Sequence, residues 1–318
     1  MQNTDDPTLR TRFNAKLMLF GEYSIIYNSM ALTVPFKHFS GELSVLHDNK
    51  YTAVDYAKNS NLQLKHYAQH LHKQAENNAF DFYINTREFI NDIKNGLYFE
   101  STIPQGYGAG SSGALIAAVY QKYASASTQY PANLRQQLAS MENFFHGRSS
   151  GIDPLVSLLN KTLLVEGETL QTVQKPNFSP TNKEGLFLVD TRKTGKTEPL
   201  VHHFISMVHN KSIDRHYLQD LNNSIINSLL TINYPQFWKL LSELSHWQQS
   251  FMQRMIPEEI LPYWQKAMEQ NICYMKLCGS GGGGYMLAFA PDYEKAQDFF
   301  NRASLPIVPV QVPDEGEK

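Results

Sequence analysis

A glycine- and serine-rich segment that runs directly into an alanine-rich one constrains this chain more than any other feature. Residues 101–113 read STIPQGYGAGSSG, and ALIAAVYQKYASA follows at once. The second stretch favours a helix, so the glycines precede a helix N-terminus, where N–H groups and the helix dipole attract anions. We therefore predict a phosphate-binding loop, and a surface loop that only caps the helix remains the alternative. No lysine follows the glycines, which excludes the common P-loop pattern G-x-x-x-x-G-K-[ST].

A second glycine-rich segment, GSGGGG at residues 279–284, satisfies the spacing G-x-G-x-x-G. A dinucleotide-binding fold requires a helix directly after these glycines, whereas the strand-like YMLAFA follows here. We therefore predict a turn between two strands. Four consecutive glycines lose much conformational entropy on folding, so the backbone should pass close to another group at this turn.

Composition excludes several classes of protein. Of the 318 residues, 42% are apolar and 18% are charged, which is typical of a globular protein. A net charge of −2 gives no overall attraction to nucleic acid or an anionic membrane, and no apolar run approaches the roughly 20 residues that span a bilayer.

The N-terminus and the two cysteines indicate the compartment. The polar N-terminus lacks the charged segment followed by an apolar segment that marks a secretory signal, and we interpret Cys273 and Cys278 as buried free thiols. We expect a cytoplasmic protein without nucleic-acid or membrane partners; the sequence leaves open whether it is a homodimer.

Hydrophobic patterning mixes strands and helices without strict alternation, which predicts an α+β fold. We expect strands at LMLF, SIIY and ALTVPF within residues 12–36, and further strands at GELSVLHD, FDFYINTR, TLLVEG, GLFLVD, YMKLCG, GYMLAFA and PIVPVQV. Helices are expected over 60–76, after the glycine loop, after Pro131, across most of 211–270, and at YEKAQDFFNRA.

Two further segments carry residues suited to phosphate chemistry. Asp153 stands before Pro154 and an apolar run, so it is an expected helix N-cap, and a catalytic carboxylate at a helix N-terminus is the second interpretation. The segment DTRKTGKT at 190–197 places three cations within five residues; a solvated basic loop explains it as well as an anion site does.

Four ordered segments together resemble the motifs of the GHMP kinase superfamily, and most closely those of its mevalonate kinases. The segments are KLMLFGEYSIIYNSMALTVP at 16–35, PQGYGAGSSGA at 104–114, HGRSSGID at 146–153 and KLCGSGGGG at 276–284. In the same order, the first segment is similar to the first motif of the family, and the other three are similar to the patterns P-x-x-x-G-L-G-S-S-A, H-G-x-P-S-G-x-D and K-L-T-G-A-G-G-G-G. The resemblance implies a two-domain α+β fold, with an N-terminal ATP-binding domain (1–182) and a C-terminal ferredoxin-like domain (183–318).

The resemblance also implies an ATP-dependent kinase that phosphorylates a small-molecule alcohol, with mevalonate as the leading acceptor and Mg²⁺ as cofactor, in isoprenoid precursor synthesis. It assigns Asp153 to the acceptor's proton, and it implies that Lys16 pairs with Asp153, keeps it ionised and stabilises charge on the phosphoryl group. Ser112 and Glu142 would bind the metal. The predicted ATP-binding residues are Gly106, Gly108, Ala109, Gly110, Ser111 and Ser112, and the predicted substrate-binding residues are Glu22, Tyr23 and Thr197.

The sequence departs from the family patterns at informative positions. Tyr23 stands where mevalonate kinases commonly have histidine beside the acceptor, and Ser149 replaces a proline. Other acceptors therefore remain open: phosphomevalonate, a sugar or homoserine. Phosphomevalonate would need extra cations, for which the candidates are Arg148, Arg192, Lys193 and Lys196. A nucleotide-binding regulator without catalysis is the alternative of another class, and it would predict loss of Lys16, Glu142 or Asp153, all of which are present.

Overall fold

The computed structural model of the chain describes residues 11–46, 53–124, 133–147, 149–195 and 197–313. The chain divides into two compact units, and neither is one continuous segment. Unit 1 comprises residues 1–16, 35–104 and 110–161, and unit 2 comprises residues 17–34, 105–109 and 162–318. Strands β1 (Phe13–Phe20) and β2 (Ala31–Val45) contribute residues to both units. The boundary at 182/183 drawn from the sequence stays a prediction.

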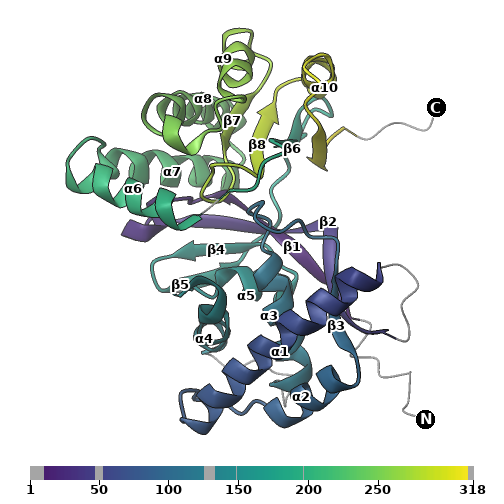
Figure 1. The fold of residues 1–318 in the computed structure, drawn as a ribbon. Helices are drawn as coiled ribbons and strands as arrows, with labels where there is room; N and C mark the ends of the chain where they lie inside the picture. Colours follow the sequence, from purple (N-terminus) through teal and green to yellow (C-terminus); the bar gives the residue numbers. More distant parts are fainter. Residues whose placement is uncertain (1–10, 47–52, 125–132, 148, 196, 314–318) are drawn as a thin grey trace. The chain divides into compact units, whose positions relative to one another are not determined.

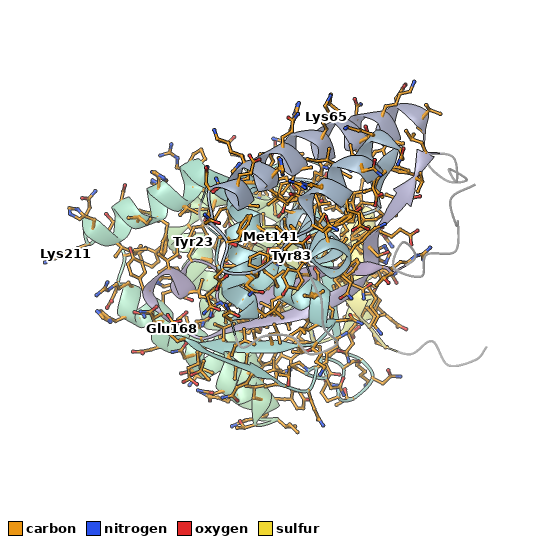
Figure 2. The ribbon with its side chains drawn as sticks, turned by 90° about the horizontal axis from the view of Figure 1, so that it is seen from below. Tyr23, Lys65, Tyr83, Met141, Glu168 and Lys211 are labelled. Atoms are coloured by element: carbon orange, nitrogen blue, oxygen red, sulfur yellow. The ribbon has the colours of Figure 1, made fainter. Side chains whose placement is uncertain are left out.

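Unit 1 is mainly helical. Its helices are α1 (Val54–Glu76), α2 (Thr86–Lys94), α3 (Ser111–Tyr123), α4 (Leu134–His146) and α5 (Ile152–Leu159). The end of β2 pairs antiparallel with β3 (Leu97–Ser101), with Gly41 opposite Ser101, and α1 packs on both α2 and β3 (Figure 1). On α4, Met141 is buried, whereas Lys65 on α1 points outward (Figure 2). The alternation of apolar and polar positions along these helices thus places one face in the core.

Unit 2 contains a hairpin and a second sheet. The start of β2 pairs with β4 (Leu163–Glu166), which pairs with β5 (Thr169–Thr172). The second sheet is separate from these strands and consists of β6 (Gly185–Asp190), β7 (Tyr274–Leu277), β8 (Tyr285–Ala290) and β9 (Ile307–Gln311). Its strands lie in the order β7-β8-β6-β9. The helices are α6 (Thr197–His209), α7 (Arg215–Leu230), α8 (Tyr234–Phe251), α9 (Leu261–Glu269) and α10 (Tyr293–Arg302). Helices α8 and α9 pack on β7 (Figure 1).

The second sheet has ferredoxin-like topology. In chain order, β6 is followed by helices, then by β7, β8, α10 and β9, and every recorded strand pair is antiparallel. This is the split β-α-β arrangement, in which the first and third strands lie side by side. Buried rings of Phe20, Phe178, Phe237 and Phe289 contact one another in the core of unit 2. The predicted α+β class with a ferredoxin-like C-terminal part is therefore confirmed.

Several expected strands differ in the structure. Residues Ser24–Tyr27, the SIIY segment, form a short 3₁₀ helix, because tight turns at Gly21 and Asn28 leave too few residues for pairing. The segment FDFYINTR contains no strand; Phe82 packs against Tyr120, and the side chain of Asn85 caps α2 instead. ALTVPF and GELSV belong to one continuous strand, β2, while β3 and β5 were not expected.

Among the described residues, no helix combines the length and the apolar character needed to cross a membrane.

Candidate active site

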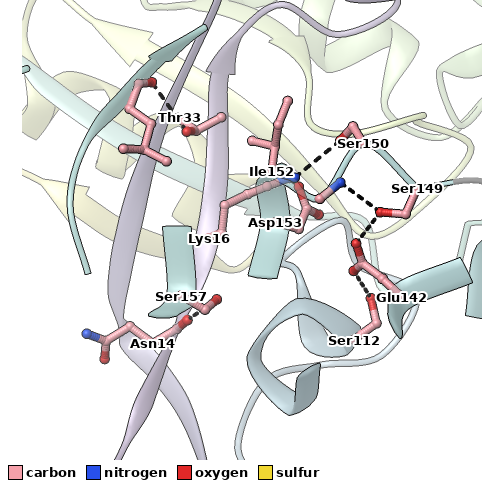
Figure 3. A network of polar contacts seen from close by, with 12 residues as sticks. Asn14, Lys16, Thr33, Ser112, Glu142, Ser149, Ser150, Ile152, Asp153 and Ser157 are labelled. Atoms are coloured by element: carbon pink, nitrogen blue, oxygen red, sulfur yellow. Dashed lines mark hydrogen bonds and ion pairs between the residues drawn. The ribbon is translucent and has the colours of Figure 1, made fainter. Parts of the chain in front are cut away.

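Lys16 and Asp153 form an ion pair in unit 1 (Figure 3). Lys16 Nζ lies 2.7 Å from Asp153 Oδ1, and the side chains are 6% and 31% exposed. Two hydrogen bonds tie β1, which carries the lysine, to α5, which carries the aspartate: Ser157 Oγ donates to Asn14 O at 2.9 Å, and Asn14 Nδ2 donates to Asn160 Oδ1 at 2.8 Å. The predicted pairing is therefore present, and these two hydrogen bonds link β1 to α5 and to the C-cap residue Asn160 beside it.

The expected role of Asp153 as a helix N-cap is wrong. Helix α5 begins at Ile152, and Gly151 is its N-cap, so Asp153 lies in the first helical turn and makes no capping bond. Gly151 has φ +72°, and a Cβ there would lie 2.2 Å from Arg135 O. The close approach to α4 fixes Gly151 as the helix start, which leaves the carboxylate of Asp153 to pair with Lys16.

The end of the glycine-rich loop approaches this ion pair. Gly110 is the N-cap of α3 at φ +75°, and a Cβ there would lie 3.3 Å from Lys16 Cβ and 3.8 Å from Asp153 Oδ2. At Gly113, a Cβ would meet the backbone of Asp153 at 2.8 Å. The two glycines therefore let the first turns of α3 and α5 pack closely beside the ion pair. The first N–H groups of a helix have no partner within it, so this corner of unit 1 is suited to an anion.

Glu142 on α4 is buried, with 3% exposure, and its carboxylate is held by two serines (Figure 3). Ser112 Oγ donates to Oε1 at 3.0 Å, and Ser149 Oγ donates to Oε2 at 2.5 Å. Burial, and secondly the charge of Asp153, raise the pKa of Glu142 to about 7. The structure thus brings both predicted metal ligands together. Ser149 was noticed in the sequence only as a departure from a pattern, and its contact with Glu142 had no sequence signal.

In unit 2, Glu22 forms a buried ion pair with Lys276. Lys276 Nζ lies 2.6 Å from Glu22 Oε1, and the side chains are 1% and 3% exposed. The ammonium also donates to Leu277 O at 2.6 Å and lies 5.7 Å from the centre of the Phe20 ring. Sequence reasoning placed Lys276 in a motif but gave it no partner. The carboxylate of Glu22 is thus already engaged within the protein.

Tyr23, also in unit 2, is 5% exposed and adopts φ +65°. Its hydroxyl donates to Ser280 O at 2.5 Å, and its ring packs against Phe204 with centroids 4.7 Å apart. Burial and the neighbouring Glu22 raise the pKa of Tyr23. Because its left-handed backbone conformation is unfavourable for a bulky residue, these contacts must compensate for it. Tyr23 joins the turn after β1 to the β7–β8 turn.

The glycines of the β7–β8 turn pack against other backbone segments of unit 2. Gly284 N donates to Lys193 O at 2.5 Å. A Cβ at Gly195 would lie 2.6 Å from Gly281 O, and one at Gly284 would lie 2.5 Å from Tyr107 Cα. The close backbone approach predicted for this turn is therefore present. The turn approaches the backbone of Lys193, Gly195 and Tyr107 in unit 2.

We expect Gly281→Ala to destabilise unit 2 strongly. Gly281 has φ +74°, and a Cβ there would lie 2.4 Å from Met255 O. Gly167→Ala is the matched control, since Gly167 has φ +56° with nothing within 4 Å. The control should lose only about 1–2 kcal/mol of unfolding free energy from backbone strain, and Gly281→Ala a further ~1–3 kcal/mol from the clash. Urea denaturation measures both; equal losses would show that the clash is relieved.

The remaining predicted residues occupy different places. Gly106 and Gly108 belong to unit 2, where Gly106 O accepts from Gly195 N at 3.1 Å and a Cβ at Gly108 would lie 3.0 Å from Cys278 O. Ala109 is buried. Ser111 begins α3 and Thr197 begins α6; the side chain of Thr197, like Arg148 and Lys196, lies outside the described residues.

The two described cations of the basic loop already have partners in unit 2. Arg192 Nη2 donates to Ser304 O at 3.0 Å, and Lys193 pairs with Glu259. Cys273 and Cys278 are buried and, among the residues that the structure describes, neither forms a disulfide, as predicted.

Comparison with known proteins gives a family match for part of the chain and similar folds for nearly all of it. Residues 61–161 match the sequence model of the family described as GHMP kinases N terminal domain. No curated protein matches the sequence. Similar solved structures include L. major mevalonate kinase in complex with R-mevalonate, at 14% identity and TM-score 0.62, covering 95% of each chain.

Two further similar structures bind other acceptors. Streptococcus pneumoniae phosphomevalonate kinase, in complex with phosphomevalonate and AMPPNP, is 13% identical, with TM-score 0.62 and coverage of 94% of this chain and 99% of that one. Lactococcus lactis galactokinase, complexed with galactose, is 11% identical, with TM-score 0.62 and coverage of 96% and 94%. At such low identity these matches establish the fold alone. Residues 61–161 thus match the N-terminal domain of GHMP kinases, and the chain as a whole is similar in fold to solved kinases of this group.

Proposed function

We propose that this protein is a small-molecule kinase that transfers the γ-phosphate of ATP to the hydroxyl group of mevalonate, giving 5-phosphomevalonate. One observation carries the proposal: the Lys16–Asp153 ion pair lies beside Gly110 at the N-terminus of α3. A carboxylate, a lysine and a helix N-terminus in one corner supply a proton acceptor, a cation and phosphate-directed N–H groups. Phosphoryl transfer depends mainly on such positioning and charge stabilisation.

Asp153 is the residue that we assign to the acceptor hydroxyl. Its carboxylate accepts or orients the proton as the hydroxyl oxygen attacks phosphorus. Lys16 holds this carboxylate at 2.7 Å and offers positive charge to the phosphoryl oxygens during transfer. Because Lys16 is almost fully buried, its charge is less screened by water than that of a surface lysine.

Gly106, Gly108, Ala109, Gly110, Ser111 and Ser112 are the residues that we assign to ATP. Ser112 and Glu142 would hold Mg²⁺. The fit is good, since a hydroxyl and a carboxylate oxygen face each other at 3.0 Å, and Mg²⁺ is usually bound by one or two carboxylates together with substrate phosphates. The raised pKa of Glu142 indicates a buried carboxylate whose charge a cation would compensate. When bound, Mg²⁺ neutralises charge on the phosphates.

The acceptor side is assigned to Glu22, Tyr23 and Thr197. The polar atoms of Glu22 and Tyr23 are engaged with Lys276 and Ser280, so these two residues would shape the surface that the acceptor contacts rather than bind its oxygens directly. Arg192 and Lys193 are likewise engaged. An extra phosphate, as in phosphomevalonate, would require further cations; of the four candidates, Arg148 and Lys196 lie outside the described residues.

An ATP-consumption assay across R-mevalonate, phosphomevalonate, galactose and homoserine tests the proposal, with a sample lacking any acceptor as the control. We expect consumption well above the control with R-mevalonate alone. Consumption with one of the other three compounds instead would replace the acceptor and keep the kinase. Consumption with none of them, together with intact ATP binding, would support a nucleotide-binding regulator.

A further inference from the structure

The hydroxyl of Ser149 connects a predicted metal ligand to the start of the helix that carries Asp153. Ser149 Oγ donates to Glu142 Oε2 at 2.5 Å and accepts from Gly151 N at 2.9 Å. Its backbone N–H donates to Asn143 Oδ1 at 2.8 Å. Ser149 is therefore fixed at its backbone and at its side chain, between α4 and the N-cap of α5 (Figure 3).

The direction of these hydrogen bonds has a consequence for Glu142. Because Ser149 Oγ accepts from Gly151 N–H, its single proton is available for the carboxylate. Ser149 therefore donates its hydrogen bond to Oε2 of Glu142, while Oε1 faces Ser112 Oγ at 3.0 Å. The carboxylate is thus held in one orientation, with Oε1 alone turned towards Ser112. A hydrogen bond to a carboxylate is also about twice as strong as one between neutral groups.

We propose that Ser149 is a positioning residue for Mg²⁺, which keeps Glu142 Oε1 directed at the metal position beside Ser112 by holding Oε2. This inference rests on the proposed function. It also explains the departure at this position: a proline, as in the pattern that residues 146–153 resemble, has neither the hydroxyl nor the N–H that Ser149 uses. The chain thus supplies through a side chain an orientation that a proline there could not provide.

The neighbouring Ser150 provides a matched control. Its Oγ accepts from Ile152 N at 3.4 Å, and its carbonyl oxygen accepts from Arg135 Nε at 2.9 Å, but no recorded hydrogen bond joins it to Glu142. Ser150→Ala therefore removes a hydroxyl from the same turn without touching the carboxylate. Ser149→Thr keeps the hydroxyl, and Ser149→Ala removes it.

The test measures AMPPNP binding to the full chain by calorimetry, once with MgCl₂ and once with EDTA. A residue that hydrogen-bonds to a metal-ligating side chain typically contributes 10- to 100-fold to the affinity for the metal. We expect Ser149→Ala to reduce the Mg²⁺-dependent gain in AMPPNP affinity by about 10-fold or more, and to leave the affinity in EDTA unchanged. Ser149→Thr should restore the gain, and Ser150→Ala should match the unsubstituted protein.

The outcomes separate this inference from the proposed function. If the unsubstituted protein shows no AMPPNP binding, the proposed function fails, and the inference fails with it. If it binds AMPPNP more tightly with Mg²⁺, but Ser149→Ala keeps the full gain, only the inference is overturned. An equal loss with and without Mg²⁺, or the same loss in Ser150→Ala, would show a general structural role and would also overturn it.

Discussion

Asp153→Asn is expected to reduce kcat by about 10²- to 10⁴-fold, the usual contribution of a positioned general base. The substitution preserves the shape of the side chain and keeps an oxygen that can accept from Lys16 Nζ, which lies 2.7 Å from Oδ1. It removes the negative charge that would accept the proton of the acceptor hydroxyl. The loss should therefore fall on turnover, while ATP binding, measured by calorimetry, should change by less than about threefold.

The matched control is Asp92→Asn. Asp92 pairs with Lys122 at 3.2 Å in the same unit, and these side chains are 26% and 9% exposed, close to the values for Asp153 and Lys16. If breaking a half-buried ion pair were enough to impair turnover, both variants would lose activity alike. Near-normal turnover in Asp153→Asn, or an equal loss in Asp92→Asn, would contradict the role that we assign to Asp153.

Local features of the site could be predicted from the sequence because their signals are local. The glycines of residues 106–113 followed by an alanine-rich stretch predicted the start of α3, and the structure places that start at Ser111. The turn at 279–284 was recognised because a strand rather than a helix follows it. In both cases the deciding residues lie within one or two turns of the chain, where backbone preference and hydrogen bonding determine the conformation.

Contacts between distant segments were predictable only in part. The Lys16–Asp153 pair was predicted from the resemblance to kinase motifs, because no sequence pattern near either residue indicates the other as its partner. Glu22 and Lys276 both lie in recognised motifs, but the sequence does not predict that they form an ion pair. A buried lysine is rare, so a lysine in a sequence is expected to be exposed to solvent. The N-cap assignment of Asp153 was wrong because close packing of Gly151 on Arg135 O decides where α5 begins, and such packing has no signal in a single sequence.

Removing the buried ammonium of Lys276 should have the largest effect on stability. Glu22 and Lys276 are 3% and 1% exposed, and Nζ lies 2.6 Å from Oε1. Lys276→Met keeps an unbranched chain in the same space but leaves the Glu22 carboxylate without its cation. Breaking a buried ion pair in this way typically destabilises a protein by about 3–5 kcal/mol. We expect a loss of that size in the free energy of unfolding, measured by urea denaturation.

A second pair in the same unit provides the control. Lys193 and Glu259 are 53% and 61% exposed, so their charges stay hydrated whether or not they are paired. Lys193→Met should therefore change the free energy of unfolding by only about 0–1 kcal/mol. A similar loss in both variants would mean that the methionine side chain, rather than the buried charge, causes the effect.

The double substitution Glu22→Gln with Lys276→Met distinguishes an unpaired charge from lost packing. Each single variant leaves one buried charge uncompensated, whereas the double variant leaves none, and replacing both members of a buried pair is often nearly neutral. We therefore expect the double variant to be more stable than Lys276→Met alone by about 2 kcal/mol or more. Additive losses would instead show that the pair contributes mainly through the contacts of the lysine with Leu277 O and the Phe20 ring. In that case, the ion pair itself would add little to the stability of unit 2.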